Sequence, residues 1–124
     1  MEMYNRNEIC KSLYTVFKNI GEKTFIDDRP SSTTTQMNSF VVIKVGEVDP
    51  MHAYGDTYVT LKVFQRDNDG TSKVTPLSDM EQKVYSLLPI DNDLYKALKP
   101  KTLEAKSDGS GFHYLTIYFD LILK

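Results

Sequence analysis

The stretch GFHYLTIYFDLILK, residues Gly111 to Lys124, alternates apolar and polar side chains along most of its length. Such alternation is typical of a β-strand with one face in the core, because successive side chains point to opposite faces of a sheet. The apolar side chains are Leu115, Ile117, Phe119, Leu121 and Leu123. The side chains between them, which point to the opposite face, are Tyr114, Thr116, Tyr118 and Asp120. Because each buried side chain of the apolar type stabilises the fold by roughly 1.5 to 3 kcal/mol, we predict that this strand forms a major part of the core.

A turn precedes this strand. Residues Ser107 to Gly111 are rich in residue types that tolerate a positive φ, so we predict a hairpin with arms Thr102 to Lys106 and Phe112 to Leu123.

Three further strands are predicted upstream. Lys23 to Asp28 can form a short strand, and the continuous apolar run Phe40 to Gly46 indicates a central strand buried on both faces. Thr57 to Asp67 alternates again. Val59, Leu61 and Val63 are expected to face the core, and Tyr58, Thr60, Lys62 and Phe64 the other side.

Two amphipathic helices complete the pattern. The first carries a stripe of Ile9, Leu13, Val16, Phe17 and Ile20, with an N-terminal box at Asn5 and Glu8 and a stop at Gly21. The second is expected to open at Ser78, which forms a capping box with Glu81, and to end at Pro89. Its stripe is Met80, Val84, Leu87 and Leu88.

The predicted order is α-β-β-β-α-β-β. It defines an α+β fold in which an antiparallel or mixed sheet of about five strands carries two helices on one face. We expect residues 1–124 to form a single domain, with a mobile loop at about 28–39, since RPSSTTTQMNS shows no apolar periodicity. Glu47 to Asp56, with Pro50 and Gly55, is expected to be an exposed connection.

Charge and hydropathy narrow the function classes. The 15 Lys and Arg residues are balanced by 17 Asp and Glu residues, so the protein lacks the excess of basic side chains that binding to a nucleic-acid backbone requires. No run approaches the roughly 18 apolar residues of a membrane span, and the first residues lack a basic region followed by an apolar core. These features predict a cytoplasmic protein without a membrane partner.

The sequence shows no grouping of catalytic, cofactor-binding or metal-ligating residues. The histidines, His52 and His113, are far apart in the chain, and Cys10 is alone on a predicted helix. DNDG at Asp67 to Gly70 lacks the later ligands of a calcium loop, so it indicates a plain turn. Asp91 and Asp93 are interpreted as turn and cap residues. We expect no enzymatic activity, no cofactor and no metal.

Aromatic side chains on the far side of two strands are the candidate contact surface. Tyr58 and Phe64 lie on one strand and Tyr114 and Tyr118 on another. Tyr is enriched at protein interfaces because it supplies a rigid surface with a polar end. Cross-strand aromatic pairs also stabilise sheets without any partner. The pattern is compatible with both roles.

The element order resembles that of the tail terminator proteins of long-tailed bacteriophages and prophages, also called tail-completion or minor tail proteins. The resemblance covers nearly the whole chain and is carried by FIDDRP with its loop, FVVIKVG, GDTYVTLKVFQRD, DMEQKVYSLL and SDGSGFHYLTIYFDLILK. It implies a non-catalytic ring of subunits, typically six, that caps the tail tube and meets the head connector.

The resemblance also implies a place and partners. The protein would reside in the bacterial cytoplasm during assembly and then in the virion tail, with itself, the tube protein and connector proteins as partners. Contact with DNA passing through the ring would be passive. The candidate residues for a surface facing the lumen or a partner are Arg29, Lys44, Lys62 and Arg66.

The alternative is a small non-catalytic ligand-binding module. It would be a monomer or dimer with a cleft between sheet and helices, lined by Tyr54, Tyr58 and Tyr114.

Overall fold

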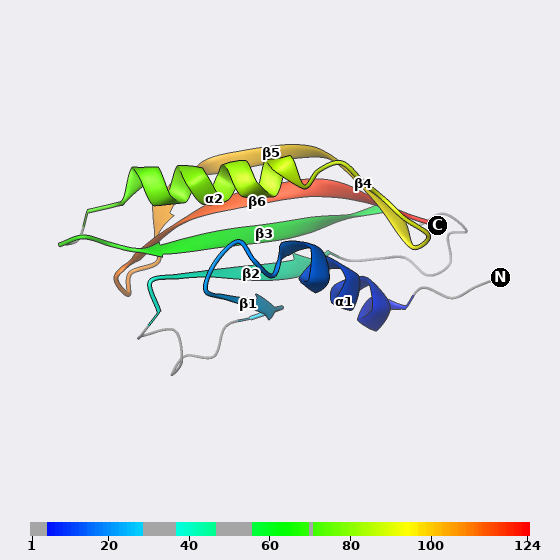
Figure 1. The fold of residues 1–124 in the computed structure, drawn as a ribbon, viewed down its shortest axis with the longest axis horizontal. Helices are drawn as coiled ribbons and strands as arrows, with labels where there is room; N and C mark the ends of the chain where they lie inside the picture. Colours follow the sequence, from blue (N-terminus) through cyan, green and yellow to red (C-terminus); the bar gives the residue numbers. More distant parts are fainter. Residues whose placement is uncertain (1–4, 29–36, 47–55, 70) are drawn as a thin grey trace.

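The computed structural model describes residues 5–28, 37–46, 56–69 and 71–124. In order along the chain, the elements are α1 (Arg6–Phe17), β1 (Lys23–Ile26), β2 (Ser39–Val45), β3 (Asp56–Arg66), α2 (Val74–Ser86), β4 (Ile90–Asp91), β5 (Tyr95–Ser107) and β6 (Phe112–Leu123). The strands form one sheet in the order β1-β2-β3-β6-β5-β4, and both helices cover the same face of it (Figure 1). β1 and β2 run parallel, whereas the other neighbours are antiparallel.

The α+β class and the two-layer arrangement are therefore confirmed. The sheet has six strands rather than about five, because the short β4 adds an edge strand beside the start of β5.

Helix α1 begins where the sequence predicts. The Asn5 side chain accepts a hydrogen bond from the backbone N–H of Glu8 at 3.1 Å, which satisfies one of the free donors of the first turn. Its apolar stripe is buried against the sheet, since Leu13 and Phe17 have no exposed surface. Arg6 donates from Nη2 to the carbonyl of Val45 at 2.9 Å and so fixes the start of the helix to the end of β2.

The predicted start of the second helix is wrong by one turn. Helix α2 begins at Val74, so Ser78 lies inside it and does not cap it. Pro76 falls in the first turn, where its missing N–H costs nothing because no intrahelical acceptor exists there. The buried stripe consists of Leu77, Met80 and Val84, whereas Leu87 follows the last helical residue and is 40% exposed.

Strands β3 and β6 occupy the centre of the sheet, and their register confirms the predicted alternation. Val59 lies opposite Phe119 and Leu61 opposite Ile117, all on the face beneath the helices and all fully buried. The Phe119 ring lies 5.9 Å from that of Phe17 on α1. One apolar cluster joins this face to both helices.

Two strand predictions need correction. β2 lies inside the sheet but is not buried on both faces, because Val42 is half-buried and Lys44 exposed. The first hairpin arm is not limited to Thr102–Lys106, since β5 spans Tyr95–Ser107. Its register with β6 is irregular between Leu98 and Lys101 and again between Leu103 and Lys106. The first irregularity, with φ of 59° at Lys99, accommodates Pro100 within a strand.

Asp91 is part of β4 rather than a turn or cap residue. The turn after it is held by Asn92, whose side-chain oxygen accepts from the N–H groups of Leu94 and Tyr95 at 2.9 and 3.0 Å. Asp91 accepts a hydrogen bond from the ammonium of Lys124, which lowers the pKa of that carboxyl. This contact joins the edge strand to the end of β6.

Most of the predicted loop at about 28–39 and residues 47–55 of the predicted connection lie outside the described residues, and with them Arg29, His52 and Tyr54. Asp56, the last residue of that predicted connection, is the first residue of β3. In the part of the chain that is described, neither helix has the length and hydropathy needed to cross a membrane.

Candidate functional site

The sheet face opposite the helices, hereafter the open face, carries the predicted contact residues. No helix among the described residues packs on it (Figure 1). The strand register places its side chains in rows that cross the sheet. One row consists of Lys44, Thr60, Tyr118 and Lys101, the next of Phe25, Val42, Lys62, Thr116 and Leu103, and the third of Lys23, Phe40, Phe64, Tyr114 and Lys106.

One end of the open face is closed by an aromatic cluster of Phe40, Phe64 and Phe112. The Phe40 and Phe64 rings stack with centroids 4.4 Å apart, and Phe112 meets Phe40 edge to face at 5.2 Å. Phe64 is only 6% exposed. Of the predicted contact residues, Phe64 therefore belongs to a second core inside the protein and offers little surface to a partner.

Arg66 is also engaged within the fold. Its guanidinium lies 4.8 Å from the Phe112 ring centroid and donates from Nη2 to the carbonyl of Met37 at 2.7 Å. These contacts attach the start of β2 to the aromatic cluster. Arg66 is thus a positioning residue for the cluster in this structure.

Beyond the aromatic cluster, the open face is hollowed. The hollow has a volume of about 700 Å³. Its polar lining consists of Asp27, Asp28, Lys44, Tyr58, Thr60, Lys62, Ser107, Asp108 and Tyr114. The lining combines hydroxyl, ammonium and carboxylate groups, which suits noncovalent contacts with a polar partner or ligand.

Two tyrosines and two lysines dominate this hollow. Tyr58 is 53% exposed, and its ring lies against Gly46, where an added Cβ would come within 2.8 Å of Cε1. The Lys62 ammonium lies 5.2 Å from the centroid of the Tyr114 ring, a cation–π contact that orients both side chains. Lys44 is exposed and makes no ion pair within the described structure. The hollow thus keeps free hydrogen-bonding capacity.

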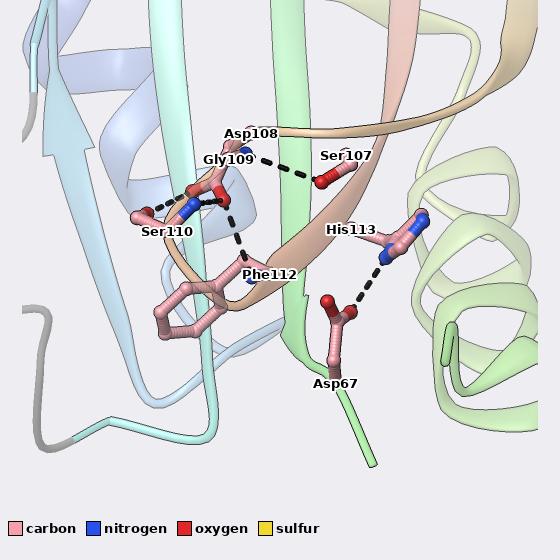
Figure 2. A network of polar contacts seen from close by, with 7 residues as sticks. All are labelled: Asp67, Ser107, Asp108, Gly109, Ser110, Phe112 and His113. Carbon is pink, nitrogen blue, oxygen red and sulfur yellow. Dashed lines mark hydrogen bonds and ion pairs between the residues drawn. The ribbon is translucent and has the colours of Figure 1, made fainter. Parts of the chain in front are cut away.

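The tip of the hairpin between β5 and β6 contributes Ser107 and Asp108 to the same hollow. Figure 2 shows how Asp108 closes the turn: Oδ1 accepts from the N–H groups of Ser110 and Phe112 at 2.8 and 3.2 Å, and Oδ2 accepts from the Ser110 hydroxyl at 2.8 Å. Positive φ angles at Gly109 and Gly111 complete the predicted turn. The hairpin tip is therefore a built structure that holds one wall of the hollow.

His113 lies beside this hairpin but not in the hollow. Its Nδ1 is 2.6 Å from Oδ1 of Asp67, whose side chain is only 7% exposed (Figure 2). The alternation of β6 places His113 on the helix-covered side. The pair joins the end of β3 to the start of β6, so its evident role is structural.

The described residues bring together no set of groups for covalent chemistry. The described lining of the hollow contains neither His nor Cys. Cys10 is buried in α1, and this burial raises the pKa of its thiol, which disfavours the nucleophilic thiolate. No group of three His, Cys, Asp or Glu side chains in the described ranges is arranged to hold a metal ion.

The structure assembles part of the predicted site. Tyr58 and Tyr118 are diagonal neighbours, because Tyr58 pairs with Asp120 and Thr60 pairs with Tyr118. Lys44 and Lys62 both line the hollow on the open face. The cleft expected between sheet and helices is occupied by packed core side chains, and the hollow lies on the other face.

Sequence reasoning missed the residues at the rim of this face. Asp27, Asp28 and Asp108 line the hollow, and Leu103 is 48% exposed on β5. Leu103 could have been recognised from the sequence as a candidate contact residue, since it is the one large apolar residue in KTLEAK. Asp108 carried none beyond its turn propensity, because its place depends on the curl of the hairpin.

The sequence matches no protein-family model, and no significantly similar sequence was found among curated proteins. The functional inference therefore depends on the geometry of the open face and on the element order.

Proposed function

We propose that this protein is a structural subunit of a phage or prophage tail, a tail terminator that forms a ring, with six subunits as the expected number. The ring would cap the tail tube and join it to the head connector, first in the bacterial cytoplasm and then in the virion. The observation that carries the proposal is the open face itself: Tyr58, Tyr118 and Leu103 lie half-buried or exposed on a sheet surface that no described helix covers.

A sheet face of this composition is stabilised when a second surface covers it. Tyr supplies rigid contact area at low entropic cost, and exposed apolar side chains gathered on one face mark interaction sites. In this proposal Lys44 and Lys62 face the lumen or a partner subunit, and DNA in transit touches them only passively. The order of helices and strands, which resembles that of tail terminator proteins, also supports the proposal.

The proposal is tested by light scattering of the purified protein over a concentration series, with and without purified tail tubes. A ring-sized species, or one that forms only with tubes, is the expected result. Tyr118→Ala should weaken assembly, whereas Tyr14→Ala, which removes a ring that is 43% exposed on α1, should not. A monomer or dimer that ignores tubes at every concentration contradicts the proposal.

The second candidate function is a small non-catalytic ligand-binding module, which the hollow of about 700 Å³ favours. This volume is within the range of small-molecule sites, roughly 300 to 1,000 Å³. A ligand screen by thermal shift, followed by Tyr58→Ala and Lys62→Ala, separates the two functions. Binding that both variants abolish, in a protein that stays monomeric with tubes, would support the module.

A further inference from the structure

We propose that subunits of this protein associate edge to edge, with strand β1 of one copy pairing with the free edge of β5 in the next copy. This inference rests on the proposed function, since it names the contact by which such a ring closes. β1 and the β4/β5 side are the opposite edges of the sheet (Figure 1). Two different edges that meet make a heterologous contact, which generates a ring when the rotation closes.

The β5 edge offers a long row of backbone groups. Of the 13 residues of β5, only Lys96 and Ala97 pair with β4. From Leu98 to Ser107, no described strand lies on the outer side of β5. An unpaired strand edge is a template for pairing with another chain. Pro100 has no N–H, and the register with β6 is irregular between Leu98 and Lys101 and between Leu103 and Lys106, so the pairing with β1 is centred on the regular segment Lys101–Leu103.

Strand directions permit the favourable pairing. β5 runs opposite to β6, β6 opposite to β3, and β3 opposite to β2, so β5 also runs opposite to β2 and to β1, which is parallel to β2. A rotation about an axis along the strands that brings the next copy's β1 beside β5 therefore makes an antiparallel pair. Antiparallel pairs are slightly more stable per residue than parallel ones.

The two edges carry opposite charge. The segment EKTFIDD, residues 22–28, has three acidic residues against one Lys, a net charge of −2. The free segment LKPKTLEAKS, residues 98–107, has three Lys against one Glu, a net charge of +2. Two β5 edges would repel each other, whereas β5 and β1 attract. The charges thus select the head-to-tail contact over a symmetric dimer.

Side chains on the open face specify a register. Leu103 is 48% exposed on β5, and Phe25 is half-buried on β1; both lie on the open face. An antiparallel pairing that sets these two opposite each other also brings Asp27, which directly follows β1, near Lys101. The Asp27 side chain is 58% exposed beside Arg6 and remains accessible to a second cation. One register therefore satisfies an apolar pair and a charge pair together.

The Phe25–Leu103 pair gives a direct test by disulfide trapping, because Leu103 lies in the regular segment Lys101–Leu103. Directly opposed residues in antiparallel strands have Cα atoms about 4.5 to 5.5 Å apart, within the range of a disulfide. In a Cys10→Ala background, Phe25→Cys combined with Leu103→Cys should form covalent multimers when assembled with tail tubes and oxidised. Phe25→Cys combined with Ser86→Cys, on an exposed position of α2, should not.

Charge reversal tests the same contact independently. Lys101→Glu with Lys106→Glu should lower assembly at least about tenfold, and so should Glu22→Lys with Asp27→Lys. A 1:1 mixture of the two variants should restore rings, because alternating copies then meet with opposite charges at every contact. Circular dichroism and thermal melting establish that each variant is folded.

The outcomes separate the two proposals. If the wild type forms rings but the cysteine pair does not cross-link and the mixture does not recover, edge pairing is overturned and the terminator proposal stands. If the wild type stays monomeric with and without tubes, both are overturned. If the reversed variants fail to fold, the cysteine pair alone decides.

Discussion

The two faces of the sheet are built on the same strands but achieve burial in different ways. On the helix-covered face, Leu61, Ile117 and Phe119 are fully buried beneath α1 and α2. On the open face, burial is confined to one end, where Phe40, Phe64 and Phe112 cover one another, and the rest is hollowed and polar. Alternation along a strand therefore predicts which residues share a face, but not whether that face is shielded from water.

Substitutions on the helix-covered face should cost the most stability. Phe119→Ala removes a fully buried ring that packs against Phe17, and we expect the free energy of unfolding to fall by about 4 kcal/mol. Tyr118→Ala, one residue earlier on the open face, should cost only about 1 kcal/mol because the side chain is half-buried. Urea denaturation measures both. Equal losses would show that the open face is as tightly packed as the other.

The next experiment asks whether the aromatic cluster is a second core. Phe64→Ala removes a ring that stacks on Phe40 and tilts against Tyr114 at 5.0 Å, so we expect a loss of about 3 kcal/mol in urea denaturation. Lys62→Ala, two residues earlier on the same face, should change stability by no more than about 0.5 kcal/mol. A small effect at Phe64 would mean that the cluster contributes little to the monomer.

The parts of this fold that depend on local pattern were predictable. Asn5 caps α1 and the alternation of β6 assigns its faces, since both follow from spacing along the chain. The start of α2 was missed because Ser78 and Glu81 match a capping box, whereas the helix begins at Val74 and includes Pro76, which the first turn tolerates. The length of β5 was missed because Pro100 indicates a break, and the irregularity around Lys99 accommodates it.

The candidate site was only half predictable for a related reason. Tyr58 and Tyr118 could be placed on one face from alternation alone. That Phe64 is buried while Tyr58 is exposed depends on which end of the face curls over, and this follows from contacts between segments distant in sequence. The same holds for Asp108, which reaches the hollow only because the hairpin tip lies over it.

The hairpin tip gives the third test, because it forms one wall of the hollow. Asp108→Ala removes an acceptor for two backbone N–H groups and one hydroxyl, and we expect a loss of about 1 to 2 kcal/mol. Ser110→Ala removes the hydroxyl donor but leaves the backbone donors to Asp108, so its effect should be smaller. Thermal unfolding of the two variants gives the comparison. If Ser110→Ala costs as much as Asp108→Ala, the backbone contacts do not hold the turn.

The smallest effect is expected at the exposed rim, where Asp91 meets Lys124. The hydrogen bond from Lys124 lowers the pKa of Asp91 in the folded protein, so the carboxylate contributes stability above its ordinary value of 3.8, and this contribution is lost as pH falls through the lower folded pKa. Asp91→Asn should therefore be slightly less stable than wild type at neutral pH and equal to it in strong acid. Asp93→Asn, in the adjacent turn, makes the same change of charge without that partner and serves as the control.

Denaturation curves at neutral pH and at a series of acidic pH values measure the difference in stability between the two variants. High salt should reduce this difference because the pair is exposed. If the difference in the free energy of unfolding between Asp91→Asn and wild type persists at the lowest pH, the Asp91 side chain acts through packing rather than through its charge.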